Sequence, residues 1–462
     1  MIAARIALVL AALAPVPAHA LQPLPAFLAS AKQHNFDNRE AVAAVRQREH
    51  QVDQAKWDMT PTINATAAYA RNQYEVKVTI PGADLTNPIT RTITPFNQFD
   101  AQLTLTQPIV DVGVLRSIDA AKHNLSAGTA RVAATEQQVA QAVAQTYFQV
   151  LAAEAFIRAT EEVHAATRAN LEIVEQRAAA GVASDLDRRR AEVEVERSRK
   201  SIADAEYNLA IARQRLTSLS GLAPEAGEVE LDVPLTEEAP LKTWVDRNDV
   251  AAIRAADAEA VSADAQVRSA SALLYPTLSA SANERFTTAT GFLGRYAIAS
   301  ASANLSWRFD LAILPQMRAA KSQAALARIR AERARQTAYD EIHGAWHQVK
   351  AALAKVRSAR AERDTSKVAV KQARQRYEAG TGLFLEVTQA ERDAFSANIS
   401  AIQADADLAS ARTLLRIQSG RDIKDAVQLR PAPPRDRFEP TPAPSPSPAP
   451  ATPAAPTPEP PR

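Results

Sequence analysis

The sequence predicts a mainly α-helical fold with a smaller β portion, built from two copies of one structural unit. Only 12 of the 462 residues are glycine and 5% are aromatic, while Ala, Glu, Gln and Arg, which lose little side-chain freedom in a helix, are abundant. Two windows of β-branched, alternating sequence interrupt the helical pattern. The same order of elements then recurs at a fixed spacing, which indicates internal duplication.

Residues 1–20, MIAARIALVLAALAPVPAHA, have the features of an export signal. Arg5 precedes an apolar run from Ile6 to Leu13, and Ala18-His19-Ala20 matches a small-x-small cleavage site. The run is shorter than the ~20 residues that span a bilayer, which disfavours a membrane anchor. We expect a signal peptide and a mature chain that begins near Leu21.

Composition excludes several classes of site. The chain has no cysteine, so disulfides, thiolate metal sites and N-terminal lipidation are absent. The net charge of +2 gives no reason to expect nucleic acid. No later window reaches about 18 consecutive apolar residues, so any membrane-embedded portion would consist of strands.

The first unit, residues 21–225, is predicted to contain a helix, a pair of strands and two further helices. Thr60-Pro61 ends the first helix, and a proline-rich loop separates the strands. Gly181 breaks the helical pattern, and Gly221 followed by Pro224 stops it. The expected elements are a helix over 26–57, strands within about 62–107, and long helices over 111–179 and 184–219.

The second unit, residues 226–425, repeats this order. Lys321, Trp346, Gly380 and Gly420 each lie 199 residues after Lys122, Tyr147, Gly181 and Gly221. The expected elements are a helix over 240–274, strands within about 277–307, and long helices over 310–379 and 384–419. Residues 426–462 are rich in proline, which predicts an extended, disordered tail.

Four strands have open edges that would leave backbone groups unsatisfied in lipid, so the chain is expected to oligomerise. Three protomers would supply twelve strands, an even number within the range of closed outer-membrane barrels. A helix of 69 residues, as over 111–179, would extend about 100 Å. These lengths predict a long cylinder attached to a barrel, with the breaks at Gly181 and Gly380 at its far tip.

The doubled order of helix, strand pair, long helix, turn and helix resembles the TolC-type outer-membrane efflux factor family. Tyr377, Gly380 and the run Leu385-Glu386-Val387 match its second turn, and the resemblance covers about residues 26–425. It implies a homotrimeric tunnel with a twelve-stranded barrel in the outer membrane of a Gram-negative bacterium, mostly projecting into the periplasm. It also implies a periplasmic adaptor protein and an inner-membrane transporter as partners, in efflux or type I secretion.

The glycine turns have two interpretations. Gly181 and Gly380 permit a sharp reversal, which a purely structural connection also needs. By the resemblance, the turns are the pore mouth and the adaptor docking site, which would explain apolar side chains at an exposed tip. The expected docking residues are Gly181, Gly380, Gly382, Leu383, Phe384 and Leu385.

The resemblance also implies a gate. Glu386 occupies the position of an acidic constriction residue, and Gln389 stands where the family has a second acid. Asp187 and Tyr377 match a pair that holds the mouth shut, although Gly382 replaces the expected basic residue. Ser184 and Asp187 equally fit a capping box, so Asp187 has a structural alternative.

Other residues give weaker signals. Arg188, Arg189 and Arg190 could bind an acidic adaptor, but a solvated helix face is the simpler interpretation. His343 and His347 are spaced to share a metal, yet no third ligand is evident, and no metal is expected. Trp57, Tyr275 and Trp307 lie close to strand ends and fit an aromatic girdle.

The sequence contains no catalytic motif, so neither an enzyme nor a cofactor is expected. The competing function is a periplasmic coiled-coil adaptor or scaffold that forms no pore. Adaptors contain one helical hairpin, whereas this sequence predicts two, each with its own strands. The nature of the cargo is not encoded in these patterns.

Overall fold

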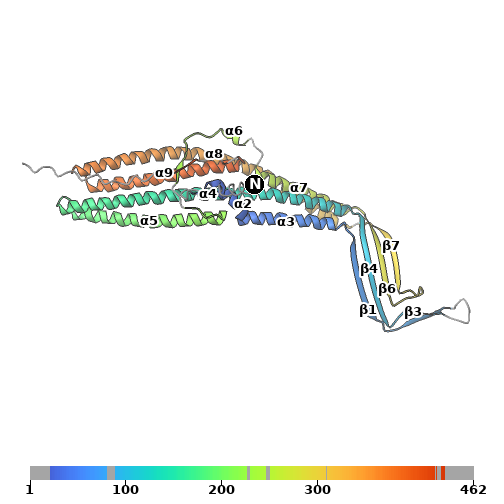
Figure 1. The fold of residues 1–462 in the computed structure, drawn as a ribbon. Helices are drawn as coiled ribbons and strands as arrows, with labels where there is room; N and C mark the ends of the chain where they lie inside the picture. The colour runs from blue at the N-terminus through green and yellow to red at the C-terminus, as the bar shows by residue number, and fades with distance from the viewer. Residues whose placement is uncertain are drawn as a thin grey trace, which may run out of the picture.

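The computed structural model describes residues 21–80, 89–225, 229–245, 250–308, 310–421, 423 and 428–431. The expected signal peptide and residues 432–462 of the expected tail lie outside the described residues. The described chain forms a long rod of helices that ends in a bent-away sheet (Figure 1). Among the described residues, no helix combines the length and apolar character needed to cross a bilayer.

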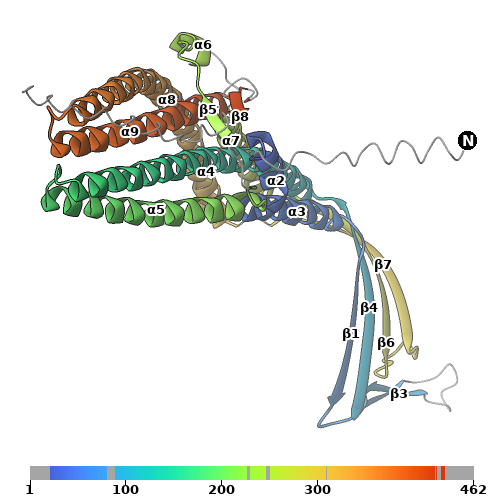
Figure 2. The same ribbon diagram turned by 60° about the vertical axis from the view of Figure 1, so that its left-hand side comes forward.

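Two long helices, α4 (Val112–Ala179) and α8 (Ile313–Glu378), run the length of the rod. Each spans about 100 Å at 1.5 Å per residue. Shorter helices cover the two halves of each: α5 (Asp185–Ser220) and α3 (Phe36–Trp57) on α4, and α9 (Phe384–Gln418) and α7 (Ala251–Ala272) on α8. The hairpins α4/α5 and α8/α9 end at the same tip (Figure 2).

The prediction of one helix over 26–57 was wrong, because the chain breaks at Asn35 into α2 (Leu24–His34) and α3. The Asn35 side chain accepts hydrogen bonds from the N–H groups of Asp37 and Asn38, as a preferred N-cap residue does. It also donates to the Leu219 carbonyl at 2.9 Å, which holds the break against the end of α5. The helix expected over 240–274 is likewise divided, into α6 (Leu241–Val245) and α7.

Four antiparallel strands form the sheet in the order β1-β4-β6-β7. They are β1 (Thr62–Arg71), β4 (Asn97–Val110), β6 (Thr277–Thr287) and β7 (Ala297–Ser306). The connection from β1 to β4 is not only the predicted loop, since it contains the paired strands β2 (Val76–Ile80) and β3 (Ile89–Thr94). The alternating, β-branched sequence of both segments explains this extra hairpin.

The main core lies in the middle of the rod. Phe27 of α2 packs against Tyr147 of α4 with ring centroids 5.6 Å apart, and Leu216, Leu408 and other side chains from all four hairpin helices close around them. Beside it, β5 (Val229–Asp232) pairs with β8 (Gln428–Pro431). The start of the expected disordered tail is therefore a strand, which corrects that prediction: β8 precedes the densest prolines, and its backbone pairs with β5.

Candidate functional site

The two turns at the rod tip have the same backbone geometry. Gly181 and Gly380 have φ of 73° and 75°, a left-handed conformation that favours glycine. At the first turn, the N–H of Val182 donates to the Arg177 carbonyl and that of Gly181 to the Ala178 carbonyl. This is the Schellman arrangement, and it satisfies carbonyls that would otherwise be free at the end of α4.

Apolar side chains are exposed at both turns. Leu383 and Leu385 are 67% and 50% exposed, and Val182 and Leu186 of the other turn are more than half exposed as well. The sequence interpretation omitted this second pair, although Leu186 lies five residues after Gly181 just as Leu385 lies five after Gly380. Together the four residues form an apolar tip.

Phe384 does not belong to that apolar tip, and its predicted exposure was wrong. The side chain is only 5% exposed and packs against Val174 and Ala191. Its ring also contacts that of Tyr377, with centroids 5.7 Å apart. As the first residue of α9, it points between α4 and α5 and fixes the second hairpin against the first.

Gly382 allows the second turn to approach α8 closely. A β-carbon at this position would lie 3.1–3.2 Å from atoms of Arg376 and Tyr377. Close packing therefore favours glycine at position 382, where the TolC-type family has a basic residue.

Asp187 forms a complete capping box at the start of α5. Its backbone N–H donates to Ser184 Oγ at 3.1 Å, and its carboxylate accepts from the Ser184 hydroxyl at 2.7 Å and from the Ser184 N–H at 3.4 Å. This is the structural alternative weighed for Asp187. A second role in gating stays a prediction, because within the described single chain no hydrogen bond joins Asp187 to Tyr377.

Tyr377 instead interacts with Arg177. The guanidinium lies 4.5 Å from the Tyr377 ring centroid, and its Nη1 donates to the Tyr377 carbonyl at 3.2 Å. This contact joins α4 to α8 across the two hairpins. It could not be predicted from local sequence patterns, since the residues lie 200 positions apart.

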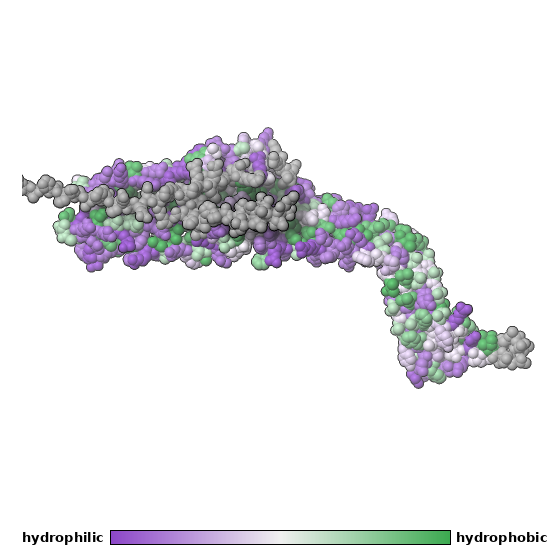
Figure 3. All heavy atoms as spheres, viewed as in Figure 1, coloured by the Kyte–Doolittle hydropathy of each residue, from purple (hydrophilic) through white to green (hydrophobic). Residues whose placement is uncertain are grey.

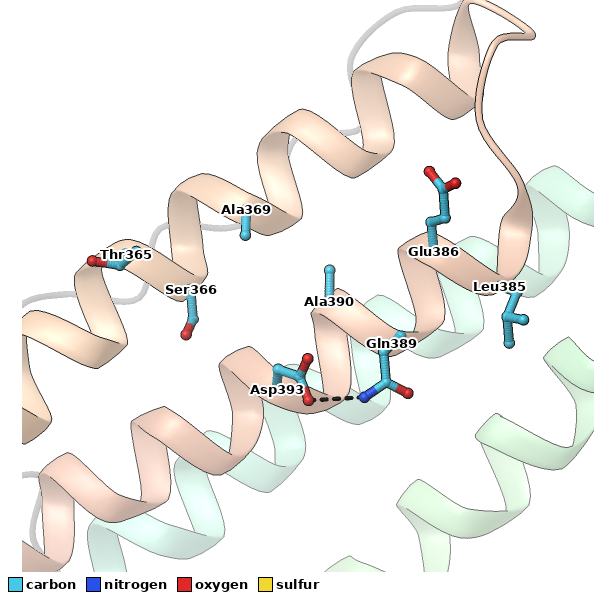
Figure 4. A pocket seen from close by; sticks show the side chains of 8 residues that line it. All are labelled: Thr365, Ser366, Ala369, Leu385, Glu386, Gln389, Ala390 and Asp393. Carbon is cyan, nitrogen blue, oxygen red and sulfur yellow. Dashed lines mark hydrogen bonds between the residues drawn. The ribbon is translucent and has the colours of Figure 1, made fainter.

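Glu386, Gln389 and Asp393 line one groove of about 520 Å³ between α8 and α9 (Figure 4). Thr365, Ser366 and Ala369 form its α8 side, and Leu385 and Ala390 complete it. Glu386 lies 3.4 Å from Arg376, and Gln389 donates to Asp393 at 2.9 Å. The structure thus adds Asp393 to the two predicted residues.

Three further polar contacts brace the helices near the tip. Glu391 of α9 accepts hydrogen bonds from Asn170 of α4 at 2.8 Å and from Arg374 of α8 at 2.6 Å. Arg392 of α9 forms an ion pair with Glu194 of α5. We call these contacts, together with Arg177–Tyr377, the tip braces. Only the adjacent charges of Glu391 and Arg392 were visible in the sequence, and their partners were not.

At the other end, the sheet has one apolar and one polar face. On β4, odd-numbered Phe99, Leu103 and Leu105 alternate with even-numbered Asp100, Gln102 and Thr104, and the strand register keeps the faces separate. The exposed large apolar residues of the first face include Ile63, Tyr69, Phe99, Leu103, Leu105, Val110, Phe286 and Leu305. Arg71 and Glu284 are charged exceptions on that face.

The polar face carries its own hydrogen bonds. Arg285 pairs with Asp100 at 2.9 Å, Gln102 donates to Asn283, and the hydroxyls of Ser281 and Ser302 are 2.9 Å apart. Hydrophobic surface is concentrated on the part of the sheet next to the rod, and hydrophilic surface covers much of the rod (Figure 3). Trp57, Tyr275 and Trp307 are exposed at the junction between them.

The arginines and histidines that gave weaker signals make contacts within their own helices. Arg188 forms ion pairs with Asp185 at 2.7 Å and Glu192 at 2.6 Å, as a solvated helix face does. His343 and His347 have ring centroids 4.6 Å apart. Across the described part of the chain, no group of three or more candidate ligands could hold a metal ion.

Comparisons with known proteins agree on one architecture. The model of the Outer membrane efflux protein family matches residues 27–222 and 248–421. The solved outer-membrane channel OprN is similar, at 22% identity and a TM-score of 0.68, over 87% of this chain and 90% of that one. No curated protein sequence matches the chain.

Two further solved structures have the same fold. The outer membrane protein VceC from Vibrio cholerae is 17% identical with a TM-score of 0.69, over 87% of this chain and 96% of its own. The outer membrane channel MtrE from Neisseria gonorrhoeae was solved in an open state. It is 20% identical with a TM-score of 0.68, over 87% of this chain and 90% of its own.

Proposed function

Because the chain belongs to the outer membrane efflux protein family, we propose that it is the outer-membrane channel of a tripartite efflux or type I secretion system. In this role it supplies a gated, passive conduit across the periplasm and the outer membrane, and an inner-membrane transporter supplies the energy. Residues 21–225 and 226–425 are the two structural repeats of each protomer.

The two-faced sheet with open edges is the observation that carries the proposal. Strands β1 and β7 each have one unpaired edge in the four-stranded order. Unpaired backbone groups are costly in lipid, so each edge must meet another strand. Three protomers close twelve strands into a barrel, with the apolar face toward lipid and the Asp100, Gln102 and Arg285 face toward water.

The rod supports the periplasmic part of the proposal. Its length of about 100 Å far exceeds what a bilayer core of about 30 Å requires. The apolar tip at its far end, formed by Val182, Leu186, Leu383 and Leu385, is a surface suited to a periplasmic adaptor protein. Glu386, Gln389, Asp187 and Tyr377 lie close to this tip, where a gate would act.

A pore-free adaptor or scaffold is not supported. Its single helical hairpin would differ from the two hairpins α4/α5 and α8/α9 found here. An adaptor also has no need for a sheet whose exposed face is formed by Phe99, Leu103 and Leu105.

The test is to express the full chain, extract it from outer membranes with detergent, and measure its mass and its conductance in planar bilayers. A trimer that conducts, with cation selectivity that decreases in Glu386→Gln, supports the channel and its acidic constriction. A monomer recovered in the aqueous periplasmic fraction would contradict the proposal.

A further inference from the structure

One exposed stripe of α9 contains no basic residue. Seven side chains recur along it at steps of three and four, so they share one helix face. They are Glu386, Gln389, Asp393, Ser396, Ser400, Gln403 and Asp407, and all are exposed. Arg392, which is also exposed, lies beside the stripe and is paired with Glu194.

A short motif occurs twice within this stripe. Gln389 donates to Asp393 at 2.9 Å, and Gln403 donates to Asp407 at 3.1 Å. The sequences are QAERD and QADAD, fourteen residues apart, or about 21 Å along a helix. In each, the amide holds the carboxylate in place without neutralising its charge, because an amide is uncharged.

The three acids of the stripe differ in their charge environment. Arg376 lies 3.4 Å from Glu386 and offsets part of its charge. Within the described residues, Asp393 and Asp407 form no ion pair, and each accepts its hydrogen bond from glutamine. Their negative charge is therefore less compensated than that of Glu386.

Of the described residues, none that lines the groove beside Asp407 is Lys, Arg or His. Asp407 lines this second groove, of about 470 Å³, to which all four hairpin helices contribute. The polar part of its lining is largely carboxamide, from Gln145, Gln149, Asn208, Gln348 and Gln403. Some exposed acids elsewhere on the rod do have an arginine partner, as Glu196 has Arg199 and Asp185 has Arg188.

We propose that Asp393 and Asp407 are the charge-selecting residues of the conduit, and that they favour cationic solutes more strongly than Glu386 does. This inference rests on the proposed channel function. In a trimer the two aspartates form two rings of three carboxylates, and rings of Asp or Glu attract cations and repel anions. The cargo class that fits them is cationic or neutral.

The test compares ion selectivity from reversal potentials across a KCl gradient. Low salt of about 0.01–0.1 M is needed, because the Debye length falls from about 30 to about 10 Å over that range. The variants are Asp393→Asn, Asp407→Asn, the double variant, Glu386→Gln and, as a control, Glu196→Gln. We expect a roughly additive loss of cation preference in the two aspartate variants, a smaller loss in Glu386→Gln and none in the control.

A second readout does not require an open pore. Since the chain has no cysteine, Ser396→Cys places a single reporter thiol in the stripe. We expect a cationic thiol reagent to react faster than an anionic one, and this preference to decrease when Asp393→Asn is added.

The contradicting outcomes are distinguishable. A conducting trimer whose selectivity and labelling ratio are unchanged in Asp393→Asn/Asp407→Asn would overturn the inference alone. A trimer in which the Ser396→Cys thiol reacts with neither reagent would also overturn it, because the stripe would then face another subunit. A wild-type protein that is not a membrane trimer would instead refute the proposed function.

Discussion

At the residue scale, glycines of one chain have opposite effects on stability. Gly380 has φ of 75°, and the space that a β-carbon would occupy there is open, so a side chain costs only backbone strain. Gly344 lies inside α8, also beside open space, where glycine is the poorer helix former.

Gly380→Ala should therefore destabilise the protein by about 1–2 kcal/mol, the cost of the left-handed conformation for an L-residue. Gly344→Ala should stabilise it by about 0.5–1 kcal/mol. Thermal unfolding of the purified protein, followed by helical circular dichroism, checks both. A melting temperature that is unchanged or raised in Gly380→Ala would show that the turn is not held in this conformation, and a lowered one in Gly344→Ala would contradict the expectation for α8.

Glu154 is a buried acid with incomplete compensation. It is 3% exposed, its Oε1 lies 2.8 Å from Arg213, and its Oε2 has no hydrogen-bond partner. Burial raises the pKa of Glu154 above the ordinary value of 4.5, although Arg213 opposes this effect. The folded state therefore holds this proton more tightly than the unfolded state does.

Stability contributed by protonated Glu154 is fully present below pH 4.5 and is lost as the pH rises through the raised pKa. The glutamine of Glu154→Gln cannot titrate. As the pH rises through that interval, we therefore expect the melting temperature of this variant to decrease less than that of the wild type. Glu196→Gln, an exposed side chain paired within its own helix, is the control. Parallel pH profiles for wild type and Glu154→Gln would contradict this assignment.

At the element scale, the two faces of β4 provide a matched pair of positions. Leu105 lies between Ile63 and Ala282 on the apolar face, while neighbouring Thr104 lies between Asn64 and Asn283 on the polar face. Leu105→Lys should impair assembly in the membrane, since a lysine facing lipid near the midplane costs about 2–4 kcal/mol.

Thr104→Lys places the same charge one residue away on the polar face, where water would solvate it. We expect wild-type amounts of trimer from this variant and much less from Leu105→Lys, as measured on semi-native gels of outer-membrane extracts. Equal yields would show that β4 does not separate lipid from water in this way.

The long elements could be predicted because their signals are local. The helix expected over 111–179 is observed as Val112–Ala179, and the turns fall at Gly181 and Gly380, where only glycine readily accepts the required φ. The break at Asn35 was missed, because its cap is reinforced by the distant Leu219 carbonyl.

Site details were missed for the same physical reason. The burial of Phe384 depends on Val174 and Ala191 of the other hairpin, so its apolar character alone suggested the wrong environment. Asp393 could have been found from its seven-residue spacing after Glu386. That it has no basic partner can be seen only once the helices are packed together. Periodicity specifies which face a residue occupies and not what lies opposite it.

At the scale of the whole molecule, the two hairpins must both hold together and separate if the tip is a gate. The tip braces connect them: Arg177 with Tyr377, Glu391 with Asn170 and Arg374, and Arg392 with Glu194. All residues of the tip braces lie in the last few helical turns before Gly181 or Gly380, or in the first few turns after them. Away from the tip, the rod is held by its large apolar core.

Glu391→Gln should loosen the tip selectively. The Glu391 side chain is 17% exposed and accepts from two different helices, so replacing its charge weakens both contacts, each worth about 1.5–3 kcal/mol. We expect higher single-channel conductance in planar bilayers with an unchanged yield of trimer, and a further increase when Arg177→Ala is added. Glu196→Gln is the matched control, because its ion pair with Arg199 lies within α5 alone. If Glu391→Gln trimers conduct like wild type, the braces do not keep the tip closed, and contacts between subunits must do so.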